Sequence, residues 1–348
     1  MEETRLSARP ANAARPALGL ASLRTYGLVI AIVLISIFFY LNNPAFAKHE
    51  NIFLLLRAMA SLAMIAFAQL LVIIAGELDL SVGSVYGLTA VTLAALWLGV
   101  GISPVQLPFV VALALALIVP LLVGATNAFF TTIVGIPSFI ATLGMLSIAQ
   151  GLELLISNAT NFNAQYSIPP PDPWELGFFR FLGNTRLPLG IPIQVLWLGV
   201  AFVVFWVIRH RTLFGFRLLA VGGNPEAARV TRLPVRRYKF IVFMLCAFMA
   251  GVAGVLDFSY VGSVGPNSGG GLTFPVFAAV VIGGASLTGG RGTVFGTLMG
   301  AVLLAILGNG LAIMGVGAFA RLIFVGLVTI GAVALDVLAQ RAGRRATR

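Results

Sequence analysis

Charged residues are scarce in this chain of 348 residues: Asp, Glu, Lys and Arg make up 9% of it, whereas soluble domains carry about 25%. Cysteine occurs once, as Cys246 inside an apolar stretch, so no disulfide can form within the chain. Neither histidine, His49 nor His210, has a partner at metal-ligand spacing. These absences argue against a soluble globular domain, a disulfide scaffold and a His/Cys metal site.

Catalytic motifs are missing as well. The segment 284–291, GASLTGGR, has the GxxxxG spacing of a phosphate-binding loop, but Gly290 stands where that loop requires lysine. The chain has no GxSxG motif, and its acidic residues form no pair suited to acid–base catalysis. We therefore expect no catalytic residue, no metal and no cofactor bound by this chain, which would not be an enzyme.

Hydrophobic residues, by contrast, make up 59% of the chain, and the mean hydropathy is +1.02. The formal net charge of +11 would suggest nucleic acid in a soluble protein. Here the basic residues fall at the ends of apolar runs, where the positive-inside rule places them. The composition therefore predicts an integral membrane protein that does not bind nucleic acid.

Crossing a bilayer takes about 20 apolar residues in a helix, and ten apolar runs follow one another along the chain. One of them, 273–284, is too short for an ordinary span, and Pro108 and Pro120 interrupt another. The sequence thus predicts an all-α, polytopic membrane bundle of about ten segments, which are 26–41, 52–75, 80–98, 107–134, 138–157, 191–208, 240–256, 273–284, 293–315 and 319–340.

Lys and Arg residues set the orientation, because 17 of the 22 fall on one side of this arrangement and 3 on the other. Both termini and the central loop are then cytoplasmic. We expect a disordered cytoplasmic tail at 1–24, a transmembrane domain at 25–340 and a basic cytoplasmic tail at 341–348. Within the domain, we expect a cytoplasmic coupling loop at 209–239 and a periplasmic loop at 158–190. Two alternatives remain open: cleavage of the first run as a signal peptide near 45–47, and a partner-docking surface on the periplasmic loop.

An internal repeat is visible, since 76–91 (GELDLSVGSVYGLTAV) resembles 283–302 (GGASLTGGRGTVFGTLMGAV). Both copies follow an apolar run and open the next one from the cytoplasmic side, so the repeat is parallel. Glycine-broken segments at matching positions indicate a transport path, although ordinary helix-packing seams would explain the glycines equally well. The candidates for the path or its hinges are Gly76, Asp79, Ser81, Gly83, Gly87, Asn127, Gly284, Gly289, Gly290 and Gly292.

Four ionisable residues, Arg57, Glu153, Asp257 and Arg321, fall near the outer ends of their runs. Charges at membrane depth are costly unless they are paired or reach the interface, so we favour mutual ion pairs or solvation at the rim over contact with a ligand. No carboxylate is expected near the bilayer midplane, which argues against a proton-coupled carrier. The polar residues Gln69, Asn127 and Asn309 are explained by helix–helix hydrogen bonds as well as by a pore.

The central loop 209–239 contains GGNPEAA. Asn224 is a favourable N-cap, Pro225 suits the first helical position, and Glu226 complements the helix dipole. The sequence predicts a helix of about two turns, with Gly222 and Gly223 as a flexible or tight approach to it. The alternative is a basic loop held at anionic lipid. The candidate coupling residues are Gly222, Gly223, Asn224, Pro225, Glu226, Ala227, Ala228 and Arg229.

Four motifs in this order resemble the permease subunit of bacterial ABC importers for simple sugars. They lie at 76–85, 124–152, 214–230 and 278–304. The resemblance implies a homodimeric or heterodimeric permease pore in the bacterial inner membrane, with a second copy of this chain as the expected partner. It further implies a sugar-binding protein outside and two cytoplasmic ATPase subunits that hold ATP and Mg²⁺. It also implies that GGNPEAA is the coupling helix, which docks in a groove of the ATPase. The competing hypothesis is an ion- or proton-coupled secondary transporter that works alone.

Overall fold

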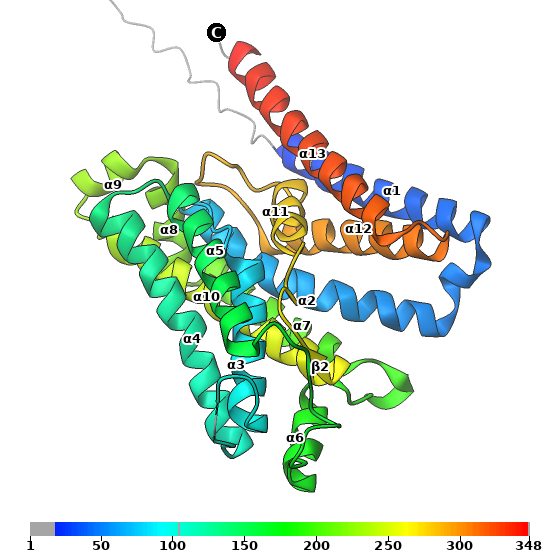
Figure 1. Cartoon of the computed structure of the whole chain (residues 1–348). Helices are drawn as coiled ribbons and strands as arrows, with labels where there is room; N and C mark the ends of the chain where they lie inside the picture. Colours follow the sequence, from blue (N-terminus) through cyan, green and yellow to red (C-terminus); the bar gives the residue numbers. More distant parts are fainter. Residues whose placement is uncertain (1–17, 104, 347–348) are drawn as a thin grey trace, which may run out of the picture.

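The computed structural model describes residues 18–103 and 105–346, and within them the fold is almost entirely helical (Figure 1). Strand β1 (Phe162–Asn163) pairs antiparallel with β2 (Ser263–Val264) and forms a minimal two-stranded sheet. The long helices are α1 (Leu18–Asn42), α2 (His49–Ile74), α3 (Val82–Leu98), α4 (Phe109–Phe129), α5 (Ser138–Ser157), α7 (Ile193–Arg211), α10 (Val235–Val261), α12 (Val294–Ile313) and α13 (Ala318–Ala346). The shorter elements are α6 (Pro173–Gly183), α8 (Leu213–Gly223), α9 (Pro225–Val230), α11 (Thr273–Ile282), the 3-10 helices η1 (Pro44–Ala47) and η3 (Pro188–Gly190), and the π-helix η2 (Phe130–Val134).

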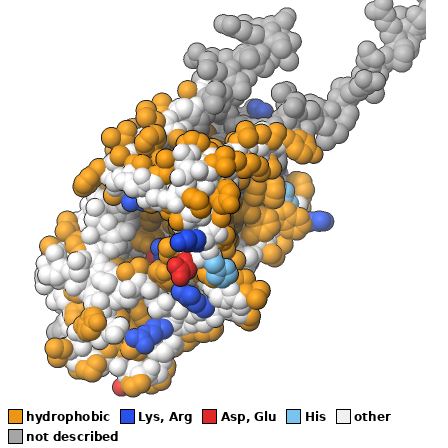
Figure 2. Space-filling view, turned by 90° about the vertical axis from the view of Figure 1, so that its right-hand side faces the viewer, with side chains coloured by type: hydrophobic (Ala, Val, Ile, Leu, Met, Phe, Trp, Pro, Cys, Tyr) orange, Lys and Arg blue, Asp and Glu red, His pale blue; other side chains and the backbone are white. Residues whose placement is uncertain are grey.

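Each of the ten predicted apolar runs coincides with a helix. Within the described residues, six helices are long and apolar enough to cross a membrane: α2, α4 with η2, α5, α7, α10 and α12. The run 273–284 forms the ten-residue helix α11, as short as its sequence predicted. The face of the molecule in Figure 2 is largely hydrophobic, with few charged side chains, and large apolar residues such as Leu122 and Leu155 are exposed. The protein is therefore an integral membrane protein.

Helix α2 lies at the centre of the bundle, and every residue from Met59 to Ile74 is buried. It packs against α7, α10, α11 and α12, and α2 and α12 run side by side in Figure 1. A helix that is apolar all round belongs in the middle of a bundle, because it offers no polar face to water.

Helix α4 departs from the prediction that proline interrupts its run. Pro120 lies inside α4 and is buried, and the chain stays helical on both sides of it. A Cβ at Gly251 of α10 would stand 2.7 Å from the Pro120 ring, so the ring and the glycine are in close contact. Proline is tolerated inside a membrane helix where a neighbouring helix packs on the site.

The outer loop 158–190 is more ordered than a surface loop, because it contains α6. The Glu175 carboxylate of α6 is buried and accepts hydrogen bonds from Trp97 Nε1 at 2.9 Å and from the Phe109 amide at 2.8 Å. Phe179 of α6 also contacts the rings of Trp97 and Phe258. Helix α6 is thereby docked on the ends of α3, α4 and α10.

The predicted tails overlap the terminal helices. Helix α1 begins at Leu18, within the predicted tail 1–24, and residues 1–17 lie outside the described part of the chain. Helix α13 continues to Ala346, beyond the predicted boundary at 340, and residues 347–348 again lie outside the description.

Candidate functional site

The first glycine-broken segment separates α2 from α3. Helix α2 ends at Ile74 and α3 begins at Val82, and between them Gly76 has φ +77°, in the left-handed region that favours glycine. The intervening backbone is not helical, and it runs from exposed Gly76 to buried Asp79 and Ser81. Non-helical backbone at membrane depth is tolerated only where protein groups or water satisfy its hydrogen bonds.

Side-chain hydroxyls satisfy this backbone. Ser138 Oγ accepts from the amide of Leu78 at 3.1 Å, and Thr142 Oγ1 accepts from the amide of Leu80 at 3.1 Å. Thr273 Oγ1 of α11 donates to the Leu80 carbonyl at 3.2 Å. Two hydroxyls from α5 and one from α11 therefore hold the α2–α3 break open as an extended segment.

Three of the predicted path residues meet in this break. Asp79 Oδ1 accepts from the Ser81 amide at 2.9 Å and from Ser81 Oγ at 2.6 Å, and Asn127 Nδ2 donates to Ser81 Oγ at 2.9 Å. None of the three side chains is more than 1% exposed. Asp79, which directly precedes the predicted run 80–98, is thus a buried carboxylate, because α4 and α5 pack on the break.

Gly83 and Gly87 behave as packing positions. A Cβ at Gly83 would stand 2.7 Å from the Gly269 carbonyl, and one at Gly87 would stand 2.3 Å from Glu153 Oε1. Glu153 is itself buried and accepts from the Ser268 amide at 3.1 Å. These contacts favour the alternative that both glycines are close-packing seams.

The second break separates α11 from α12. Helix α11 ends at Ile282, and α12 begins at Val294. Its backbone turns through residues with positive φ, and the Ser286 amide donates to the Arg291 carbonyl at 3.1 Å. The predicted hinge glycines all have positive φ: Gly284 (+98°), Gly289 (+83°), Gly290 (+72°) and Gly292 (+157°).

The two breaks touch each other and the central loop. The amide of Gly290 donates to the carbonyl of Ile74 at 2.9 Å. Gly222, in the last turn of α8, lies on both: a Cβ there would stand 1.6 Å from the Ile74 carbonyl oxygen and 2.9 Å from the Gly290 nitrogen. No other residue type fits this position without displacing backbone.

Further close approaches complete this contact. A Cβ at Gly289 would stand 2.6 Å from the Gly222 carbonyl oxygen and 3.1 Å from Gly76 Cα, and one at Gly290 would stand 2.7 Å from Gly223 Cα. We call this meeting of three segments the glycine junction; its residues are Ile74, Gly76, Gly222, Gly223, Gly289 and Gly290. It brings together predicted coupling residues and predicted hinge residues from both breaks.

The junction decides between the two expected roles of Gly222 and Gly223. Both end helix α8, so they form a tight and not a flexible approach to the next helix. Helix α8 itself was not predicted, although Thr212 caps it by accepting from the Gly215 amide at 3.2 Å. Arg209, also missed, is 9% exposed and its Nε donates to the Gly292 carbonyl at 3.1 Å.

Helix α9 follows directly from the junction. It begins at Pro225, and Asn224 Oδ1 accepts from the Ala227 amide at 3.0 Å, so the predicted cap is confirmed. Glu226 and Arg229 are exposed, whereas Ala228 is buried against the rest of the molecule. Helix α9 therefore exposes its charged side chains and is packed against the rest of the molecule through Ala228.

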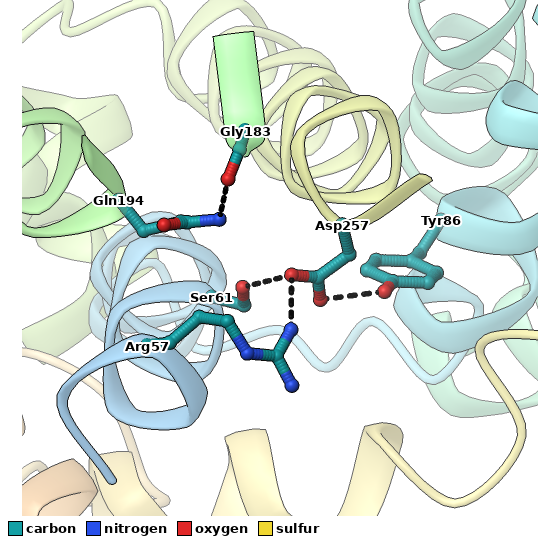
Figure 3. A network of polar contacts seen from close by, with 6 residues as sticks. All are labelled: Arg57, Ser61, Tyr86, Gly183, Gln194 and Asp257. Carbon is teal, nitrogen blue, oxygen red and sulfur yellow. Dashed lines mark hydrogen bonds and ion pairs between the residues drawn. The ribbon is translucent and has the colours of Figure 1, made fainter. Parts of the chain in front are cut away.

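A second polar cluster joins α2, α3 and α10 (Figure 3). Arg57 Nη1 and Asp257 Oδ1 form an ion pair at 3.3 Å, which confirms the predicted pairing of charges. Ser61 Oγ donates to the same oxygen at 2.8 Å, and the Tyr86 hydroxyl donates to Asp257 Oδ2 at 2.6 Å. The Arg57 guanidinium also lies 4.1 Å from the centre of the Tyr260 ring.

The polar residues in other helices make helix–helix hydrogen bonds, as the sequence allowed. Asn51 and Asn309 exchange two, at 2.9 and 2.8 Å. Cys246 Sγ donates to Gln69 Oε1 at 3.0 Å.

Comparison with known proteins identifies the family. Residues 51–333, which include both breaks, the junction and α9, match the family described as branched-chain amino acid transport system / permease component. The chain belongs to this family. The permease is 35% identical over 322 residues, 92% of each chain, to the probable ABC transporter permease YphD of Escherichia coli K12.

Two further relatives carry substrate names. Over 313 residues, 89% of this chain and 90% of the relative, the permease is 34% identical to the ribose import permease RbsC of Bacillus subtilis 168. Over 373 aligned positions, 92% of this chain and 93% of the relative, it is 31% identical to the xylose transport permease XylH of Escherichia coli K12. No solved structure matches the chain.

Proposed function

We propose that this permease is the membrane-spanning subunit of a bacterial ABC importer that takes up a monosaccharide or a related small polyol. Its relatives named for ribose and xylose support the substrate class. The proposal places the protein in the inner membrane, with about ten spans, a parallel repeat and cytoplasmic termini. Its partners are a second permease copy, an extracytoplasmic sugar-binding protein and an ATPase that holds ATP and Mg²⁺.

The observation that carries the proposal is the connection from α9 to both broken helices. Asn224 caps α9 and directly follows Gly223, the last residue of α8. Gly222 in turn contacts Ile74 at one break and Gly290 at the other. A displacement of α9 therefore reaches both breaks through a contact that contains no flexible side chain.

The mechanism follows from this geometry. The ATPase dimer closes on ATP and shifts α9, with Glu226 and Arg229 facing the ATPase surface. Helix α8 moves with α9 and carries the two breaks with it, so that the pore switches between outward and inward openings. The permease supplies two conformations, and the chemistry of hydrolysis stays on the partner.

Uptake in proteoliposomes tests the proposal. The permease is reconstituted with its ATPase subunit and sugar-binding protein, and radiolabelled ribose and xylose serve as probes. We expect uptake that requires internal-side ATP, the ATPase and the binding protein. Uptake that continues without the ATPase would contradict the proposal.

A stand-alone coupled carrier is the second candidate function, because Asp79 supplies the deeply buried carboxylate that such carriers use. Its signature is uptake driven by an imposed ion or proton gradient in the permease alone. The same vesicles, prepared without ATPase and given a gradient, separate the two mechanisms.

A further inference from the structure

Asp79 differs from the other carboxylates inside the described structure. Both oxygens of Glu175 accept a hydrogen bond, and the partly buried Asp257 accepts three, one of them from Arg57. Buried Glu153 accepts from the Ser268 amide and has no oxygen that is both buried and without a partner. Asp79 Oδ1 accepts two, but the buried Oδ2 has no donor. Buried polar oxygens without a partner are rare in folded proteins, and a buried carboxylate oxygen is the most costly kind.

A second oxygen in the same cluster has the same property. Asn127 gives its amide N–H to Ser81 Oγ, which gives its own hydrogen to Asp79 Oδ1, and Asn127 Oδ1 is left buried without a donor. No described group donates to Asp79 Oδ2 or to Asn127 Oδ1. Both oxygens belong to side chains that are 1% exposed and are joined through Ser81 in one hydrogen-bonded cluster.

No positive side chain of the described residues neutralises Asp79. The ion pairs found there are Arg57 with Asp257 and Lys239 with Glu77. The titratable group that faces Asp79 from α10 is the Cys246 thiol, which has no positive charge to offer. The hydroxyls that α5 and α11 bring to the break are used by the backbone at Leu78 and Leu80.

We propose that Asp79 and Asn127 form a binding site for a single positive charge, supplied by a proton or by Na⁺. A proton on Oδ2 turns that oxygen into a donor and removes the buried charge. A sodium ion is a hard cation that takes carboxylate, amide and hydroxyl oxygens, which are the groups present here. This inference concerns the permease alone and does not rest on the proposed import of sugars.

The site has a structural consequence because Asp79 lies in the α2–α3 break. Occupancy stabilises the extended segment in its buried position. When the positive charge leaves, the carboxylate is stable only in contact with water, so the break has to open. Occupancy of the site and the conformation of the break are therefore linked.

Infrared difference spectroscopy of the full-length permease in lipid nanodiscs tests the site. Spectra of the wild type and of Asp79→Asn are subtracted at neutral pH in Na⁺-free choline buffer, and Na⁺ is then added. A proton at the site gives a protonated-carboxyl C=O band that disappears in Asp79→Asn. Sodium at the site gives carboxylate bands that shift on addition of Na⁺ and not of choline.

Glu153→Gln is the matched control, since Glu153 is also buried but accepts from the Ser268 amide. It is expected to keep the band or shift assigned to Asp79. If Asp79→Asn fails to fold, ¹³C-aspartate labelling of the wild type makes the same assignment by isotope shift. Asp79 carboxylate bands that are present without Na⁺ and do not change with it would overturn the proposal.

Discussion

Gly290 donates its amide hydrogen to the carbonyl oxygen of Ile74 at 2.9 Å, and this bond ties the second helix break to the first. Ile74 is the last residue of α2, whereas Gly290 precedes α12. The bond lies under Gly222 of α8, so the element that leads into α9 covers the point where the two breaks meet. Four predictions follow from this contact and from the packing around the breaks.

Gly222→Ala is expected to abolish coupled uptake, whereas Gly223→Ala is expected to preserve it. A Cβ at Gly222 would stand 1.6 Å from the Ile74 carbonyl oxygen, whereas one at Gly223 has Gly290 Cα at 3.9 Å as its nearest neighbour. Overpacking of a tight core costs about 1–3 kcal/mol. ATP-dependent uptake and ATPase rate are measured together in the reconstituted transporter, after thermal unfolding has shown that both variants fold.

The adjacent glycines form their own control, because both substitutions add one methyl group to the end of α8. Equal uptake by the two variants would show that the glycine junction does not transmit motion. Loss of uptake with continued ATP hydrolysis in Gly222→Ala would locate the defect between the ATPase and the breaks.

Thr142→Val is expected to destabilise the permease by about 1–3 kcal/mol, because it leaves the partly buried Leu80 amide without an acceptor. The substitution keeps the shape of the side chain. Thermal unfolding in detergent measures the loss, and hydrogen exchange at Leu80 should become faster. Thr126→Val is the control, since its hydroxyl is exposed and bonds only to the Leu122 carbonyl of its own helix. Equal stability of the two variants would contradict the role given to the Thr142 hydroxyl.

Gly296→Ala is expected to loosen α11 from α12. A Cβ at Gly296 would stand 2.0 Å from the Gly283 carbonyl oxygen, whereas Gly308 on the same helix has nothing within 4 Å of that position. Small residues let membrane helices approach closely, so the expected loss is about 1–3 kcal/mol at Gly296. Gly308→Ala should be neutral or should stabilise the helix by up to about 1 kcal/mol. Thermal unfolding of the two variants under identical conditions makes the comparison, and a Gly296→Ala variant as stable as wild type would refute it.

Asp257→Ala is expected to destabilise the permease more than Arg57→Ala does. Asp257 accepts from Arg57, Ser61 and Tyr86, so its removal strands three donors, while Arg57 keeps its contact with the Tyr260 ring. The two side chains are 16% and 23% exposed, which screens the pair and limits the loss to about 1–3 kcal/mol. A double-mutant cycle on thermal stability should give a total below the sum of the single losses. Strict additivity would show that the ion pair contributes nothing.

Local features of the sequence were sufficient for the helices and for the cap of α9. The run 138–157 coincides with α5 because an apolar stretch in lipid must form its hydrogen bonds within one helix. Asn224 caps α9 because its side chain reaches an amide three residues away, which local sequence specifies. Helix α8 was missed although Thr212 carries the same signal, and α6 was missed because Pro and aromatic residues there resemble a loop.

Non-local contacts decided the rest. Pairing of Arg57 with Asp257 was one of several possible pairings of four charges, and only the meeting of α2 with α10 selects it. Asp79 was one of ten candidates for the path or its hinges, and only the packing of α4 and α5 on the break shows that its carboxylate is buried. The carboxylate then becomes a buried charge, and its chemistry changes with its surroundings.

The sequence by itself determined that this protein crosses the membrane, where its long apolar helices lie, and that GGNPEAA contains the start of a capped helix, because each of these depends on residues close together in the chain. The tertiary structure alone decided that Gly222, Ile74 and Gly290 share one contact. A glycine in the sequence indicates that another segment of the chain can approach the backbone closely at that position. Which backbone passes there is set by packing between segments far apart in the chain, and that packing connects α9 to both breaks.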